Sequence, residues 1–141
     1  MQANQTDNEA LLDAITIFRD VAAEEGWQIT LEKDEGALFY SPEEIPAGSV
    51  LRQVTDEFAI YVDDKMRPRG VVIEYFGDNF MEHHPKIKQL NSLFEKNDGS
   101  EDIVITRNEL ESDKQAKAFK ELLESTLFLE AFSGGHCICD K

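Results

Sequence analysis

The residues best suited to chemistry stand at the end of the chain, in the run Gly-His-Cys-Ile-Cys-Asp-Lys. His136, Cys137 and Cys139 bring together one imidazole and two thiols, which are the donors that a soft metal such as zinc prefers. Alternate residues of an extended tail point the same way, so Cys137 and Cys139 could share one ion. The sequence therefore offers zinc as a candidate cofactor. The alternative is a tail without a ligand, either frayed or folded as a short strand that buries Ile138 and the thiols.

Two more imidazoles, His83 and His84, precede Pro85 at the entry to a predicted helix. A closed zinc site needs four ligands, and either histidine could complete the set that the tail begins. The pair could also ligate a metal or act as a base, and a plain capping and surface role is the alternative. The sequence contains no glycine-rich phosphate loop and no G-x-S-x-G, H-E-x-x-H or Walker pattern. We therefore predict no catalytic residue, no enzyme activity and no cofactor other than the zinc alternative.

Charge is the most prominent bulk property, because 14 basic residues stand against 29 acidic ones and give a net charge of −15. Residues 1–26, 27–76 and 77–141 contain 6, 10 and 13 acidic and 1, 5 and 8 basic residues, so each third nets −5. Such a chain repels nucleic acid and anionic membranes. The negative surface favours a basic protein as the partner; the alternative is that it serves solubility alone.

Two groups of carboxylates are the predicted contact surface for a basic partner. The first group lies on the predicted helix over residues 7–25. Its four side chains point within about 60° of one another around the helix axis and form a stripe about 22 Å long. The second group consists of sheet-edge acids. The first group is Glu9, Asp13, Asp20 and Glu24, and the second is Asp56, Glu57, Asp63 and Asp64. The alternative is an outer face that is only solvated.

The helix over 7–25 is predicted from apolar residues at helical spacing. Thr6 and Glu9 have the spacing of a capping box at its start, and Gly26 is a natural stop at its end. The apolar positions are Leu11, Ile15, Phe18 and Ala22, with Ala14 and Val21 beside them.

Residues 27–76 predict a β-meander of about five short strands, because apolar and polar side chains alternate there between turn signals. The strands are expected at 27–31, 37–40, 49–55, 57–63 and 70–76. The last strand should turn Val71, Ile73 and Tyr75 to one face and Val72, Glu74 and Phe76 to the other. An unpaired carboxylate among apolar neighbours is costly, so we expect Glu74 at the rim or paired with a base such as Arg52. A catalytic carboxylate with a raised pKa is the alternative.

The turn before the last strand is basic, because Lys65, Arg67 and Arg69 follow Asp63 and Asp64 closely. We expect these bases to neutralise the two aspartates, and a small anion site is the alternative.

After residue 76 the spacing of apolar residues changes from that of strands to that of helices. A helix is predicted over 85–96, a short strand over 103–105, and a last helix over 112–132, followed by the tail 133–141. Thr106 and Glu109 have the spacing of a capping box. The whole, residues 1–141, is predicted to be a single α+β domain, with two later helices covering the same face of the sheet as the first.

The compartment predicted from the sequence is the cytoplasm. No apolar run reaches the roughly 18 residues of a membrane span, and the first residues lack the pattern of a signal peptide. Cys137 and Cys139 stand too close together for an ordinary structural bridge, which fits a reducing environment.

The runs Glu-Gly-Ala-Leu-Phe-Tyr at 35–40, Asp-Asp-Lys at 63–65 and Gly-Val-Val-Ile-Glu at 70–74 resemble a family of short bacterial proteins of unknown function with the pattern D-A-L-Y, then D-x-x-G-x-x-V-G-I-E-I. The resemblance covers residues 35–76 only, and it implies a compact β-meander. Members of that family often lie beside a small toxin-like protein, which implies an antitoxin-like role. This chain departs from the pattern in a longer turn after Asp64 and in Val72, where the family has glycine.

The sequence thus predicts a non-enzymatic acidic module that masks a basic partner such as a toxin, a nuclease or a nucleic-acid-binding protein. Two alternatives remain open: a small metal-binding protein that uses the C-terminal tail, and a subunit of a larger assembly.

Overall fold

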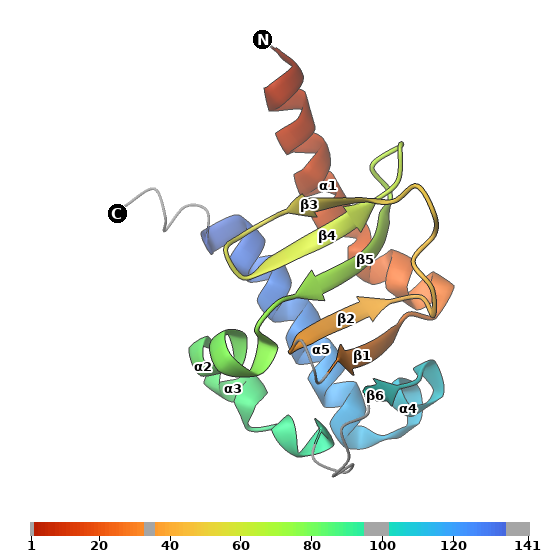
Figure 1. The fold of residues 1–141 in the computed structure, drawn as a ribbon, viewed down its shortest axis with the longest axis vertical. Helices are drawn as coiled ribbons and strands as arrows, with labels where there is room; N and C mark the ends of the chain where they lie inside the picture. The colour runs from red at the N-terminus through yellow and green to blue at the C-terminus, as the bar shows by residue number, and fades with distance from the viewer. Residues whose placement is uncertain (1, 33–35, 95–101, 135–141) are drawn as a thin grey trace.

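The chain folds into a six-stranded antiparallel sheet with helices α1 and α5 crossing one face, behind the strands in Figure 1. This computed structural model describes residues 2–32, 36–94 and 102–134, and the side chains of 9–32, 36–94 and 102–132. The strands are β1 (Gln28–Glu32), β2 (Ala37–Ser41), β3 (Val50–Gln53), β4 (Phe58–Val62), β5 (Pro68–Ile73) and β6 (Ile103–Ile105). The long helices are α1 (Gln2–Glu25) and α5 (Lys114–Leu129). The predicted α+β fold class is confirmed.

Short helical segments fill the rest of the described chain. They are η1 (Phe76–Phe80), α2 (Met81–His83), α3 (Pro85–Lys88), η2 (Asn91–Phe94), α4 (Arg107–Ser112) and η3 (Glu130–Gly134). Among the described residues, no helix combines the length and the apolar character needed to cross a membrane.

The strand order is β3-β4-β5-β2-β1-β6, so only β3, β4 and β5 form a meander in chain order. The expected meander is interrupted after β2, because β2 pairs with β5 through Leu38 opposite Ile73 and Tyr40 opposite Val71. The connection from β2 contains Pro42 and Pro46 and is too long for a tight hairpin. It carries the chain to the far edge of the sheet, where β3 begins.

The core lies between the sheet and the two long helices. Strand alternation sends Ile29, Leu38 and Ile60 inward, and each is fully buried. The apolar stripe of α1 packs there as predicted, with Ala14, Ile15, Phe18, Val21 and Ala22 buried. From α5 come Ala116, Phe119, Leu123 and Leu127. The inner face of the sheet and two amphipathic helices therefore bury one common apolar cluster.

Helix α1 begins at Gln2, five residues before the predicted start. Thr6 therefore lies inside the helix, and the expected capping box with Glu9 does not mark its start. The helix ends as predicted, at Glu25. Gly26 follows with φ of 68°, the left-handed conformation that glycine adopts without strain.

The end of β5 differs from the prediction. The strand was expected to reach Phe76 but stops at Ile73, and Tyr75 has a φ of 54°. This turn breaks the alternation, so Phe76 is fully buried and Tyr75 is 63% exposed. The predicted orientation of these two residues was therefore wrong. Glu74 is exposed, as expected for a position at the rim.

The predicted helix over 85–96 is broken into α3 and η2, and residues 95–96 lie outside the described residues. Pro85 starts α3, and Ile87, Leu93 and Phe94 are buried although the helix is not continuous. The predicted last helix over 112–132 is observed as α5, which η3 follows. Thr106 and Glu109 form the expected capping box, but it begins the separate helix α4. Asp113 then caps α5 through the backbone N–H groups of Gln115 and Ala116.

One polar pair is buried within the core. The Tyr40 hydroxyl donates to Glu124 Oε2 at 2.5 Å, between β2 and α5. Burial raises the pKa of Tyr40, and the nearby Glu124 carboxylate raises it further. Burial also raises the pKa of Glu124, although the hydrogen bond from Tyr40 acts against this rise. The pair gives Glu124 the partner that a buried carboxyl requires.

Candidate functional site

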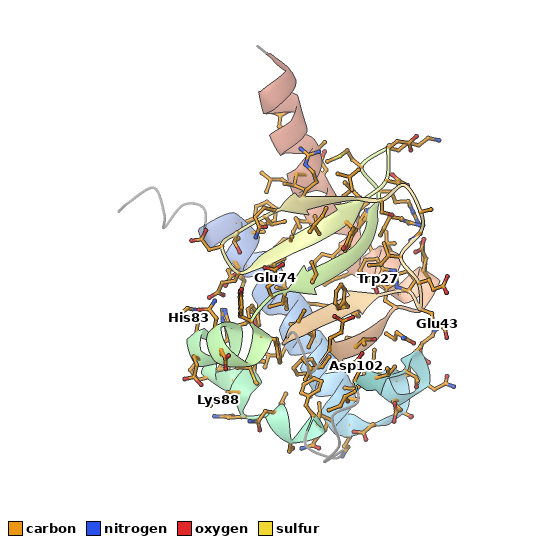
Figure 2. The ribbon with its side chains drawn as sticks, viewed as in Figure 1. Trp27, Glu43, Glu74, His83, Lys88 and Asp102 are labelled. Carbon is orange, nitrogen blue, oxygen red and sulfur yellow. The ribbon has the colours of Figure 1, made fainter. Side chains whose placement is uncertain are left out.

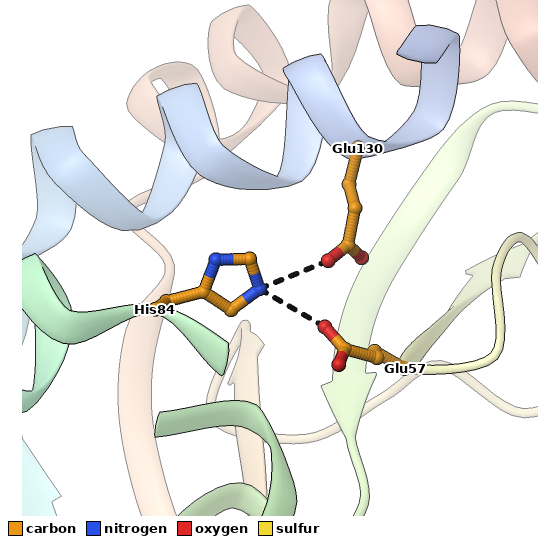
Figure 3. Close-up of side chains that lie close together, drawn as sticks. All are labelled: Glu57, His84 and Glu130. Atoms are coloured by element: carbon orange, nitrogen blue, oxygen red, sulfur yellow. Dashed lines mark hydrogen bonds and ion pairs between the residues drawn. The ribbon is translucent and has the colours of Figure 1, made fainter. Parts of the chain in front are cut away.

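Three side chains that are distant in sequence meet at one end of the sheet: Glu57, His84 and Glu130 (Figure 3). His84 Nε2 lies 3.0 Å from Glu57 Oε1 and 2.9 Å from Glu130 Oε2. Each residue offers one possible ligand atom, and the three atoms lie within 4.8 Å of one another. All three side chains are partly exposed, by 12% for Glu57, 21% for His84 and 17% for Glu130. The cluster is therefore close to solvent yet well fixed.

The turn before β4 positions Glu57. The Thr55 hydroxyl accepts the backbone N–H of Glu57 at 3.1 Å and donates to Glu130 Oε1 at 3.0 Å. Thr55 itself is 9% exposed. One nearly buried hydroxyl thus ties the Glu57 backbone and the Glu130 carboxylate to the same turn.

His84 stands between α2 and α3, where the chain extends for one residue. Pro85 follows it and disfavours a helical conformation at this position. The imidazole packs on the buried ring of Phe80, with centroids 4.3 Å apart. The neighbouring His83 Nδ1 contacts Glu57 Oε2, although the His83 side chain is 58% exposed. Both histidines therefore reach the same carboxylate.

Glu130 follows the last residue of α5 and begins the turn η3. Burial raises the pKa of its carboxyl to about 7, and the adjacent Glu57 contributes to the rise. Burial also opposes ionisation of Glu57, but hydrogen bonds from Glu130, His83 and His84 outweigh it and hold the pKa of Glu57 below its usual range. The two carboxyls consequently share one proton near neutral pH, with Glu130 as its carrier.

The arrangement suits a cation. An imidazole nitrogen carries at most one hydrogen, yet His84 Nε2 faces two carboxylate oxygens at hydrogen-bond distance. A divalent ion among the three atoms would satisfy all of them and replace the proton on Glu130. Nitrogen and oxygen donors of this kind bind zinc, manganese and iron(II). Next to His84 is a hollow of about 340 Å³ that Lys86, Ile87, Leu122 and Thr126 help to line.

The predicted helix stripe is exposed at all four positions, Glu9, Asp13, Asp20 and Glu24. Not every carboxylate of this stripe is free to contact a partner, because Glu24 Oε1 lies 3.4 Å from Arg67 Nη2. The arginines of the β4–β5 turn act on Asp63, as expected, and they also reach the end of α1. Arg67 and Arg69 form ion pairs with the end of α1, the second at 2.8 Å to Glu25.

The sheet-edge acids separate into different environments. The Asp63 carboxylate accepts the backbone N–H groups of Lys65 and Arg67, both at 2.9 Å. Burial raises its pKa, but these bonds and the nearby arginine charges outweigh burial and lower it. Asp56 and Asp64 are exposed, whereas Glu57 turns to the histidines. The four residues therefore stand in different environments, and their role as a contact surface stays a prediction.

The predicted tail ligands His136, Cys137 and Cys139 lie outside the described residues. The sequence did suggest His83 and His84 as possible ligands, and the structure brings both to Glu57. Sequence reasoning missed Glu130 and Thr55. The only signal for Glu130 was an acid at the end of an apolar helix, which is ordinary on its own.

No family model matches the sequence, and no curated protein or solved structure is similar enough to match it. The resemblance of residues 35–76 to a bacterial family therefore stays a prediction.

Proposed function

We propose that this protein binds a divalent transition-metal ion through Glu57, His84 and Glu130. The supporting observation is that one imidazole nitrogen faces a carboxylate oxygen of each glutamate at 3.0 and 2.9 Å. Two carboxylates compensate the charge of a divalent ion, and the neutral imidazole adds the nitrogen donor that zinc favours. Three protein ligands leave a coordination position for water or for a bound group, as in catalytic zinc sites.

The metal would connect three parts of the fold that the chain itself joins only distantly. Glu57 precedes β4, His84 separates α2 from α3, and Glu130 follows α5. Any ion that binds the folded chain and not the unfolded chain stabilises the fold. Metal binding by this protein is therefore expected to raise its resistance to denaturation, whatever further chemistry the open position supports.

The test is zinc titration by calorimetry after chelator treatment. Cys137→Ser with Cys139→Ser removes the tail thiols and serves as the background, so that only the cluster is measured. This background should bind one equivalent of zinc, and the further change His84→Ala should abolish binding. Glu82→Gln is the matched control, because Glu82 is an exposed carboxylate on α2 that pairs with Lys88. No zinc binding in the background variant would refute the proposal.

Binding of a basic protein is a second candidate function. The net charge of −15 favours such a partner. In the part of the chain that the structure describes, no basic side chain pairs with the exposed Asp13 or Asp20 of α1. Retention of one basic protein from the source lysate at low salt, with release at moderate salt, is the expected result. The variant Asp13→Lys with Asp20→Lys should lose that protein if α1 is the contact surface.

A further inference from the structure

The face of the sheet opposite α1 and α5 is turned toward the viewer in Figure 1 and is not covered by a described helix. Cross-strand pairing aligns one row of side chains over this face. The row is Gln53, Ala59, Val72, Phe39, Thr30 and Val104. Its centre is apolar, because Ala37, Ala59 and Val72 are only 6%, 4% and 5% exposed beneath the partly buried rings of Phe39 and Tyr61.

Two adjoining hollows lie on this face and share Leu51, Val72, Glu74 and Tyr75 as lining residues; we refer to them together as the sheet-face groove. Their volumes are about 250 and 90 Å³. Both are below the roughly 300–1,000 Å³ of pockets that enclose a whole small molecule. The sheet-face groove is therefore of a size for single side chains.

Charge at the sheet-face groove has one sign. Glu74 follows β5, where Figure 2 labels it, and Asp56 lines the smaller hollow; both are exposed. Of the described residues, no lysine or arginine lines either hollow. The walls add aromatic rings from Phe39, Tyr61 and Tyr75, and such rings attract a cation over their faces.

The conformation of Tyr75 gives a separate indication. A bulky residue in the left-handed region is strained, and such strain persists where the surroundings enforce it, often at functional sites. Tyr75 has a φ of 54° and is 63% exposed, although its neighbour Phe76 is fully buried. The fold therefore keeps an aromatic side chain in solvent at the edge of the groove, at a cost in backbone energy.

We propose that the sheet-face groove binds arginine or lysine side chains from an extended segment of a basic partner protein. The aliphatic stem of such a side chain lies along Leu51 and Val72, and its cationic head reaches Glu74 or Asp56. The negative charge of the whole chain attracts the segment. The proposal rests on the second candidate function, but it assigns the contact to the sheet rather than to the α1 stripe.

The test uses the full chain, labelled with ¹⁵N and kept in chelator, with a capped peptide Gly-Arg-Val-Arg-Gly as the probe. The control peptide has citrulline in place of each arginine, which keeps the shape and removes the charge. Amide signals of Leu51, Tyr61, Val72 and Glu74 should shift with the arginine peptide and not with the citrulline peptide. Glu74→Gln with Asp56→Asn should weaken binding at least tenfold.

The matched variant is Asp13→Asn with Asp20→Asn, which removes the same number of charges from α1. It should change affinity less than twofold. If this variant loses binding and the shifts fall on α1, the groove is wrong while binding of a basic partner survives. If the arginine peptide does not bind at all, the sheet-face groove proposal is overturned, whereas the second candidate function still depends on retention of a basic protein from the lysate. Equal binding of the citrulline peptide would overturn the role of the carboxylates.

Discussion

Glu130→Gln should make the metal-free protein more stable at pH 8. In the folded chain, burial and the neighbouring Glu57 raise the pKa of Glu130 from 4.5 to about 7. The folded state thus holds this proton more tightly than the unfolded state does. Its stabilising effect is fully present below about pH 4.5 and is lost as the pH rises through about 7. Glutamine keeps the shape of the side chain and carries no charge at any pH.

The size of the effect follows from the pKa shift. One pKa unit corresponds to ~1.4 kcal/mol, so the shift from 4.5 to about 7 has an upper limit of ~3–4 kcal/mol. Because the carboxyl is only partly buried, solvent screening reduces the expected gain to ~1–2 kcal/mol at pH 8. At pH 5 the wild-type carboxyl is already protonated, so the two proteins should have nearly equal stability there.

The assay is urea unfolding with chelator at pH 5 and pH 8, and it compares the free energies of unfolding of wild type and Glu130→Gln. Glu82→Gln is the control. Lys88 lowers the pKa of Glu82, so removal of the Glu82 charge should not raise the free energy of unfolding at pH 8. A Glu130→Gln variant that is no more stable than wild type at pH 8, or that gains equally at both pH values, would refute the reasoning about the paired carboxyls.

The remaining predictions concern the metal, the buried polar pair and the core. Zinc affinity should fall as the pH is lowered from 8 to 6, because zinc must displace the proton that Glu130 holds with a pKa of about 7; calorimetry at both pH values checks this, and a pH-independent affinity would count against Glu130 as a ligand. Tyr40→Phe should cost ~1–3 kcal/mol of unfolding free energy, because it removes the hydrogen bond to the buried Glu124. This loss of unfolding free energy should be larger at pH 8 than at pH 5. The control is Tyr61→Phe, on the face of the sheet opposite α1 and α5. Phe119→Ala should cost ~3–5 kcal/mol by leaving a cavity beside Phe76 and Phe94; a cost below that of Tyr61→Phe would contradict the assignment of the core.

The fold was largely predictable because its signals are local. The spacing of Ile15, Phe18 and Ala22 located the buried face of α1, and the alternation of Phe58, Ile60 and Val62 located the buried face of β4. The order of the strands was not predictable in this way. The pairing of β2 with β5 depends on the path of the loop that contains Pro42 and Pro46. The local spacing of apolar residues does not predict that path. The turn at Tyr75 was missed because a left-handed tyrosine has no characteristic sequence signal.

Only part of the candidate site could be predicted from the sequence. The adjacent histidines His83 and His84 suggested chemistry by their type, but their partners come from segments 26 and 46 residues away. Glu57 was predicted as a sheet-edge contact for a partner, and the structure places its carboxylate against His83 and His84. Glu130 is one of 29 acidic residues, so composition could not single it out. Tertiary structure alone brings these three groups together.

The most direct test of the metal site is X-ray absorption at the zinc edge on the full chain loaded with one equivalent of zinc. Ligation by Glu57, His84 and Glu130 predicts a first shell of oxygen and nitrogen at about 2.0–2.2 Å and no sulfur. A sulfur shell at about 2.3 Å would instead place the ion on Cys137 and Cys139 and would contradict the assignment of the site.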